Sequence, residues 1–266
     1  PEKLPLPDDQ VRIIFHIREK KMPTVQKLAF SGNNYLSQQK ISQLIFFKPD
    51  QYRISDIYKI QEKVLDLYLS KAFLFCEVTF DSLSLRDSLL TAHFRVIENK
   101  QLRFSNALIR GNKVSKASSL IKISHLKKNQ LLTPELIETA ENQLNSKEYL
   151  HNCSIIPVNE QTILFEVDES KMTRIEGVAS FSQSSQKSLI GYLNFEFLNL
   201  FGSDRNLNFR WQSSQNQQKY LKMKYADPGP LTVPLAFNLS FEREEVDSSY
   251  IKVMTEAEIY TYFDKH

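Results

Sequence analysis

The sequence predicts an α+β fold of two strand–helix–helix–strand–strand repeats, followed by a run of antiparallel all-β strands. Three observations predict it. Gly32-Asn33 and Gly111-Asn112 each follow a short apolar stretch, and Gly-Asn indicates a turn because both residues tolerate positive φ. Behind each pair, apolar residues recur at helical spacing. From Arg174 onward, strict alternation of apolar and polar residues replaces that spacing, as in half-exposed strands.

Residues 1–22 are expected to be the closing part of a preceding repeat. Val11–Ile17 and the charged residues after it resemble Phe94–Lys100, the expected last strand of the next repeat. A lone strand cannot bury its apolar face, so we expect a further repeat upstream in a longer chain.

Residues 23–100 are predicted to form the first complete repeat. After the Gly32-Asn33 turn, Ser37 is the expected N-cap of a short helix, and a second helix is expected to begin at Ser55. That second helix carries an apolar stripe of Ile57, Ile60, Val64 and Tyr68. The repeat is expected to close with two strands, Leu74–Leu85 and Leu89–Glu98.

Residues 101–171 are predicted to form the second repeat. Ser115 is the expected N-cap after the Gly111-Asn112 turn, and Thr133-Pro134 starts the second helix with proline at the first helical position. The stripe of that helix is Ile137, Ala140 and Leu144, and the closing strands are His151–Val158 and Gln161–Asp168.

Residues 172–266 are predicted to form about six strands of a partial transmembrane β-barrel. Segments of about 10 residues with one apolar and one polar face suit a strand that has lipid on one side and polar surroundings on the other. A soluble antiparallel sandwich produces the same alternation, and alternation alone leaves both open. The many aromatic residues on the apolar faces favour the barrel.

Composition argues against several other classes. The longest apolar run, Ala72–Cys76, is far shorter than the roughly 18 residues of a membrane-spanning helix. Cys76 and Cys153 cannot form a disulfide framework, and no residues show zinc-site spacing, so we expect no metal and no cofactor. The net charge of +3 is spread along the chain, so no nucleic-acid partner is expected. The glycine positions exclude the common nucleophile and phosphate-binding motifs, and we expect no enzyme.

Together, these pieces resemble a known family. The two Gly-Asn repeats resemble POTRA (polypeptide-transport-associated) domains. The later segments are similar to the start of the barrel in the BamA/TamA superfamily of outer-membrane assembly and translocation proteins. The residues that carry this part of the resemblance are Gly177–Ser182, Gly191–Phe195, Asn199–Arg205 and Tyr225–Pro228. The motif residues are Gly32, Asn33, Gly111, Asn112, Asn199 and Gly202.

The sequence departs from the family pattern in two ways. Ala72 and Glu148 stand where such domains usually have glycine before the aromatic residue that opens the second strand. The family's barrels also have many more strands than the six counted here. We therefore expect either a piece of a longer chain or a short relative that completes its barrel with other subunits, since open sheet edges in lipid are costly.

The resemblance implies that the POTRA repeats bind extended client polypeptide by β-augmentation along the second strand of each sheet. The candidate residues are Phe75, Glu77 and Thr79 in the first repeat and Ser154 and Ile156 in the second. Pro157 supports an edge position for the later strand, because proline cannot donate to an internal ladder.

The first barrel strand resembles one side of a lateral seam that admits client strands. Its candidate residues are Ile175, Gly177, Ala179 and Phe181, and its small side chains predict weak pairing. The resemblance also implies a location in the outer membrane with the repeats in the periplasm. The implied partners are unfolded outer-membrane or secreted polypeptides, outer-membrane lipid and accessory subunits.

Three alternatives remain open from the sequence. One is a soluble periplasmic interaction module with a sandwich tail. The second is a relative that serves polypeptide secretion or lipid export. An RNA-binding α+β protein is the third, although lysines 113, 116, 122, 127 and 128 fit a solvated helix face better.

Overall fold

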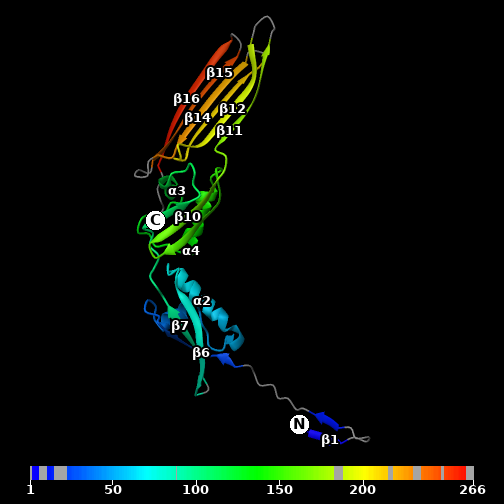
Figure 1. The fold of residues 1–266 in the computed structure, drawn as a ribbon, viewed down its shortest axis with the longest axis vertical. Coiled ribbons are helices and arrows are strands. Elements are labelled where there is room, and N and C mark those ends of the chain that lie inside the picture. The colour runs from blue at the N-terminus through cyan, green and yellow to red at the C-terminus, as the bar shows by residue number, and fades with distance from the viewer. Residues whose placement is uncertain are drawn as a thin grey trace. The chain divides into compact units, whose positions relative to one another are not determined.

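The computed structural model describes residues 2–5, 11–14, 23–87, 89–182, 188–214, 218–229, 235–246 and 249–261 (Figure 1). The chain divides into two compact units, Pro1–Asn99 and Lys100–His266. Within the described ranges, every helix is too short or too polar to cross a membrane.

The first unit contains a three-stranded sheet with helices against one face. The sheet order is β4-β7-β6, with β4 parallel to β7 and β6 antiparallel to it. Its elements are β4 (Lys27–Ser31), α1 (Gln38–Leu44), η1 (Ile54–Asp56), α2 (Ile57–Leu69), β6 (Glu77–Arg86) and β7 (Leu89–Ile97). Two small antiparallel pairs accompany it: β1 (Glu2–Pro5) with β2 (Val11–Ile14), and β3 (Thr24–Val25) with β5 (Tyr52–Arg53). The end of the predicted strand Val11–Ile17 lies outside the described residues.

The core of the first unit follows from the helical stripe. Ile57, Ile60, Val64 and Tyr68 of α2 are buried against the sheet, as predicted. The Ser37 side chain caps α1 by accepting a hydrogen bond from the backbone N–H of Lys40 at 3.3 Å. The second helix begins later than predicted, because Ser55 belongs to the 3-10 turn η1 that precedes α2.

The second unit begins with the same topology. Its small sheet has the order β8-β10-β9, with β8 parallel and β9 antiparallel to β10. Its elements are β8 (Asn106–Arg110), α3 (Ala117–Ile123), α4 (Pro134–Asn145), β9 (Leu150–Asn159) and β10 (Thr162–Glu169). Thr133 caps α4 with its hydroxyl, which accepts from Leu136 N, and Pro134 opens that helix. One prediction is wrong: the N-cap of α3 is Lys116, because the Ser115 side chain bonds elsewhere in the unit.

Six antiparallel strands follow in sequence order and form one sheet (Figure 1). They are β11 (Thr173–Ser182), β12 (Ser188–Leu200), β13 (Arg205–Ser213), β14 (Gln218–Asp227), β15 (Leu235–Val246) and β16 (Tyr250–Thr261). Each described strand pairs only with its sequence neighbours, so β11 and β16 are the two edges of an open sheet. The predicted six strands are confirmed, and within the described residues no second sheet packs on this one to make a sandwich.

The register of this sheet gathers most apolar side chains on one face. Phe195 lies opposite Phe209, and Met223 lies between Phe209 and Phe241 in the same row. The rings of Phe195 and Phe209 are 5.8 Å apart. Rows of polar residues alternate with these rows, so one face of the sheet is mainly apolar and the other mainly polar, although Lys219, Arg243 and Glu245 lie at one end of the apolar face.

Candidate functional site

The first candidate client-binding strand, β6, lies at an edge of its sheet. Glu77 and Thr79 are exposed, and Phe80 is 39% exposed. Phe75 lies outside the strand: residues 74–75 form a turn that Cys76 N closes by donating to Phe73 O at 3.0 Å. The strand therefore begins at Glu77 rather than at Leu74, and Phe75 is half-buried beside its start.

The second candidate strand, β9, is also an edge strand. Ile156 is 42% exposed and Ser154 is half-buried. Pro157 lies inside the strand, opposite Ile163 of β10, which agrees with the edge position that the proline predicted.

The candidate seam strand, β11, is exposed from Thr173 to Phe181. Ile175 and Phe181 are 64% and 58% exposed, and Gly177 and Ala179 are also exposed. The strand pairs with β12 in an unbroken register from Thr173 opposite Phe197 to Ser182 opposite Ser188. A Cβ on Gly177 would lie 2.6 Å from the side chain of Leu193, so the leucine of β12 folds over the glycine.

The Gly-Asn pairs build matching turns in the two repeats. Gly32 and Gly111 have φ of +81° and +90°, and a Cβ on either would lie within about 2.1 Å of a backbone oxygen, that of Val96 or Val167. The side chains of Asn33 and Asn112 then donate to a backbone carbonyl three residues on, at 2.8 and 2.9 Å. Only glycine allows the turn to lie so close to the central strand.

A glutamate at the end of the last strand anchors the loop that follows each turn. Glu98 accepts from Tyr35 N at 2.8 Å, and Glu169 accepts from the backbone N–H groups of Lys113, Val114 and Ser115 at 2.8 Å each. Burial disfavours the charged form of Glu169, but a hydrogen bond with the Ser115 side chain and these backbone hydrogen bonds outweigh it and hold the pKa of Glu169 below the ordinary value. The second repeat thus presents a rigid loop.

That loop binds the turn between β12 and β13. The Asn199 side chain, 1% exposed, donates to Ser115 Oγ at 2.8 Å and accepts from Asp204 N at 2.7 Å. Gly202 has φ +70°, its carbonyl accepts from Lys116 N at 2.9 Å, and a Cβ there would lie 2.1 Å from Val114 O. Asn199 and Gly202, which the sequence marks only as motif residues, therefore join the second repeat to the six-stranded sheet.

Asp204 completes this turn as a buried carboxylate. It accepts from the Tyr149 hydroxyl at 2.7 Å and from Lys147 Nζ at 2.6 Å, and its own side chain is 7% exposed. Burial is the main cause that raises the pKa of Tyr149, so this hydroxyl stays a donor. Both partners lie between α4 and β9, so the carboxylate bonds directly to the repeat.

A second turn of the sheet contacts the same repeat. Lys122, in the last turn of α3, donates to the carbonyl oxygens of Pro228 and Gly229. Asp227 accepts from Gly229 N at 2.8 Å and pairs with Arg205 at 2.8 Å. Burial lowers the pKa of Lys122, although Asp227 and Asp204 oppose the shift. We call the 199–204 and 227–229 contacts together the joint.

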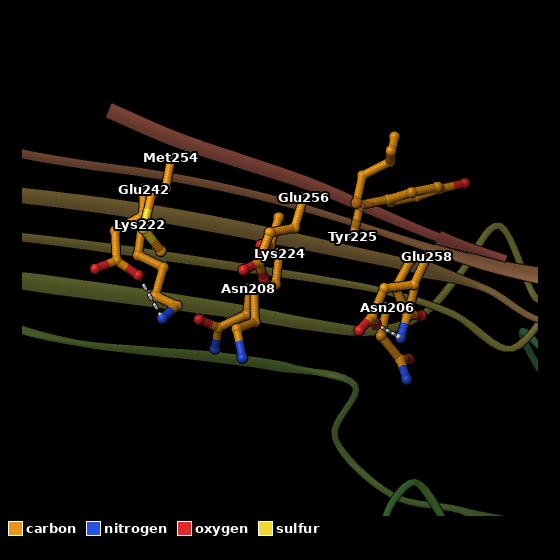
Figure 2. Close-up of a pocket in the computed structure, with 13 residues that line it drawn as sticks. Asn206, Asn208, Lys222, Lys224, Tyr225, Glu242, Met254, Glu256 and Glu258 are labelled. Carbon is orange, nitrogen blue, oxygen red and sulfur yellow. Dashed lines mark hydrogen bonds and ion pairs between the residues drawn. The ribbon is translucent and has the colours of Figure 1, made fainter. Parts of the chain in front are cut away.

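The polar face of the sheet carries a shallow groove of about 360 Å³ (Figure 2). Lys222 and Glu242 point toward each other across it, with Nζ and Oε2 2.7 Å apart. Asn208, Lys224 and Glu256 lie in the next polar row, contributed by β13, β14 and β16. The groove carries both signs of charge, and Lys222 and Glu242 form an ion pair in it, which fits a hydrated surface.

Groups that could perform chemistry are sparse. Ser84 Oγ lies 2.8 Å from His93 Nε2, but the described residues place no carboxylate beside this imidazole to complete a triad. The same residues hold no cluster of three His, Cys, Asp or Glu side chains suited to a metal ion. Burial raises the pKa of Cys76 to about 12, so its thiol stays protonated.

Comparisons with known proteins agree with this architecture. The POTRA family model, described as surface antigen variable number repeat, matches residues 102–170. A comparison with curated proteins by sequence finds no match. Two similar solved structures are BamA from Haemophilus ducreyi lacking POTRA domains 1–3 and CdiB from Escherichia coli.

The BamA structure is 17% identical with a TM-score of 0.56, covering 85% of this chain and 44% of its own. CdiB is 15% identical with a TM-score of 0.50, covering 89% of this chain and 46% of its own. This chain thus spans less than half the length of either structure. Residues 102–170 match the POTRA family model, and the chain shares the fold of the BamA structure, POTRA repeats followed by antiparallel strands of a barrel, over 85% of its length.

Proposed function

We propose that this chain belongs to an outer-membrane factor that assembles or translocates polypeptides, and that its POTRA repeats bind extended clients by strand addition. The observation that carries the proposal is the edge position of β6 and β9. A strand edge offers backbone N–H and C=O groups to an incoming strand, so affinity comes from the main chain with little sequence selectivity.

The path from repeat to sheet supports a hand-over of the client. β10 ends at Glu169 and β11 begins at Thr173, so the central strand of the repeat leads directly into the exposed edge of the sheet. Arg174 at the start of β11 pairs with Glu148, just before β9, at 3.1 Å. The edge strand of the repeat and the proposed seam strand therefore start at the same junction.

The six-stranded sheet fits a place in the outer membrane, with the repeats in the periplasm. Its apolar rows would face lipid and its polar groove the interior of a barrel. A barrel must close, so the edges β11 and β16 would be covered by further strands. Accessory subunits and outer-membrane lipid are the other partners that we propose.

The experiment that tests the location is flotation of the full chain with lipid vesicles, together with gel migration before and after heating. We expect flotation and heat-modifiable migration. A soluble interaction module with a sandwich tail is the alternative, and it would remain at the bottom of the gradient without detergent.

Client binding is tested by site-specific photo-crosslinking at Thr79 and Ile156. We expect extended outer-membrane polypeptides to be captured at one or both positions, with Glu138 on the exposed side of α4 as the unlabelled control position. The nature of the captured molecules distinguishes protein insertion from the alternatives of polypeptide secretion and lipid export. An engineered disulfide between β11 and β12 tests the seam. If the crosslinked protein still assembles or translocates its clients as the wild type does, β11 does not serve as a seam.

A further inference from the structure

Side chains of α4 occupy the outer edge of β9. Asn145 donates through Nδ2 to Cys153 O at 2.9 Å and accepts from Cys153 N at 2.8 Å. Glu141 accepts from Ile155 N at 2.7 Å. The two side chains are one helical turn apart and so project on the same side of α4. The amide of Asn145 thus makes the pair of bonds that a residue of a neighbouring strand would make.

The third outward position of β9 lacks a donor. Residues 153, 155 and 157 alternate along the strand, so their backbone groups point the same way. Their register with β10 is continuous from Ser154 opposite Glu166 to Pro157 opposite Ile163. Since the N–H groups of Cys153 and Ile155 are directed to α4, the missing N–H of Pro157 belongs to the same row. Three successive outward positions therefore offer no free N–H to a client strand.

The corresponding edge of the first repeat is much less covered. Leu69-Ser70-Lys71 ends α2 as Asn145-Ser146-Lys147 ends α4, so Leu69 and Leu65 occupy the places of Asn145 and Glu141. Leucine side chains cannot bond to a backbone. Within the described residues, α2 makes one hydrogen bond to the backbone of β6, from Gln61 Nε2 to Val78 O at 2.8 Å.

We propose that β6 is the receptive edge for an extended client polypeptide, and that Glu141 and Asn145 close β9 against strand addition. This inference rests on the proposed function, because it decides which of two candidate edges the client uses. β6 exposes Glu77 and Thr79 on one face and part of Phe80 on the other, beside an edge without such a cover, which suits an extended strand with mixed side chains. Glu141 and Asn145, which we call the cap, prevent extended strands from pairing with β9 as a second edge.

The test uses the full chain with a photo-crosslinking residue at Thr79 or at Ile156. The probe is a biotinylated peptide that copies Leu235–Val246, an amphipathic strand of this protein. We expect the peptide to crosslink about tenfold more at position 79 than at position 156, because Asn145 and Glu141 already occupy the N–H groups of Cys153 and Ile155 and the carbonyl of Cys153. In the Glu141→Ala/Asn145→Ala variant, crosslinking at position 156 should rise to a similar yield. Glu141→Gln is the matched control, since its amide oxygen still accepts from Ile155 N.

The outcomes separate this inference from the function on which it rests. Equal crosslinking at both positions of the wild type would overturn the inference and leave strand addition in place. A double variant that stays unlabelled at position 156, while position 79 is labelled, would also overturn it. No crosslink at either position in either protein would contradict the proposed function, and the inference with it.

Amide hydrogen exchange of the wild type keeps the test informative if the double variant does not fold. We expect the N–H groups of Cys153 and Ile155 to be protected, and Glu141→Gln to preserve that protection. Rapid exchange at both amides in the folded wild type would contradict the cap.

Discussion

Replacing Asp204 by alanine should loosen the second repeat from the six-stranded sheet. The substitution removes two hydrogen bonds to a buried carboxylate, from Tyr149 and from Lys147. Bonds to charged groups contribute about 1.5–3 kcal/mol each. The Lys147 side chain is 33% exposed, so solvent screens its bond to Asp204, and we take less than about 1.5 kcal/mol for it. Alanine must also adopt the φ of +57° that Asp204 has, which costs roughly 1 kcal/mol more. We expect a total loss of about 3–4 kcal/mol.

Two measurements on the full chain in detergent check this expectation. Denaturant unfolding can be followed by the fluorescence of Trp211, the single tryptophan, which lies in β13. Spin labels at Glu138 in α4 and Gln212 in β13 report the distance between repeat and sheet, and its distribution should broaden in the variant. Asp204→Asn tolerates the positive φ and keeps the side-chain size, so it should lose about half as much.

Asp168→Asn is the matched control, because it removes an exposed carboxylate of the same repeat without touching the joint. Wild-type stability together with an unchanged distance distribution in Asp204→Ala would refute the reasoning. That result would mean that the turn 199–204 does not hold the repeat to the sheet.

Three further predictions concern the same unit. Gly111→Ala should cost at least about 1–2 kcal/mol in unfolding free energy, since φ is +90° and the new Cβ would collide with the backbone oxygen of Val167; a melting temperature equal to the wild type would contradict this. Glu169 has a lowered pKa in the folded chain, so its contribution is present above the unfolded value near 4.5 and is lost as pH falls through the folded pKa. Glu169→Gln should reduce the loss of unfolding free energy at acidic pH, and the same loss in variant and wild type would exclude a contribution from Glu169. Lys122→Met should speed hydrogen exchange at Gly229, and unchanged exchange there would show that the lysine does not hold the turn.

Much of the fold could be predicted because its signals are local. Gly32 and Gly111 require a backbone conformation that the sequence makes visible, and the buried stripe from Ile57 to Tyr68 is a periodic pattern. Alternation likewise predicted all six strands of the large sheet. These features depend on φ and on the spacing of apolar residues, which neighbours along the chain determine.

The features that the sequence did not predict depend on contacts between segments that are distant along the chain. Ser115 reads as a helix cap, but its hydroxyl accepts a hydrogen bond from Asn199, which is far along the chain. Glu141 and Asn145 lie off the apolar stripe of their helix, so the helical spacing gives no sign that they bond to the backbone of β9. Pro157 correctly marks an edge, but the sequence does not reveal that α4 already occupies the row to which it belongs.

The joint also has a consequence for the order in which the chain acquires its structure. Asn199, Phe201, Gly202 and Asp204 all have positive φ, so the turn between β12 and β13 is unfavourable by itself. Its hydrogen-bond partners are supplied by the loop and helix ends of the preceding repeat. The turn therefore closes at least cost after that repeat has folded. The second repeat thus acts as a template for the β12–β13 hairpin, so these two strands are aligned by a part of the chain that is complete before they are.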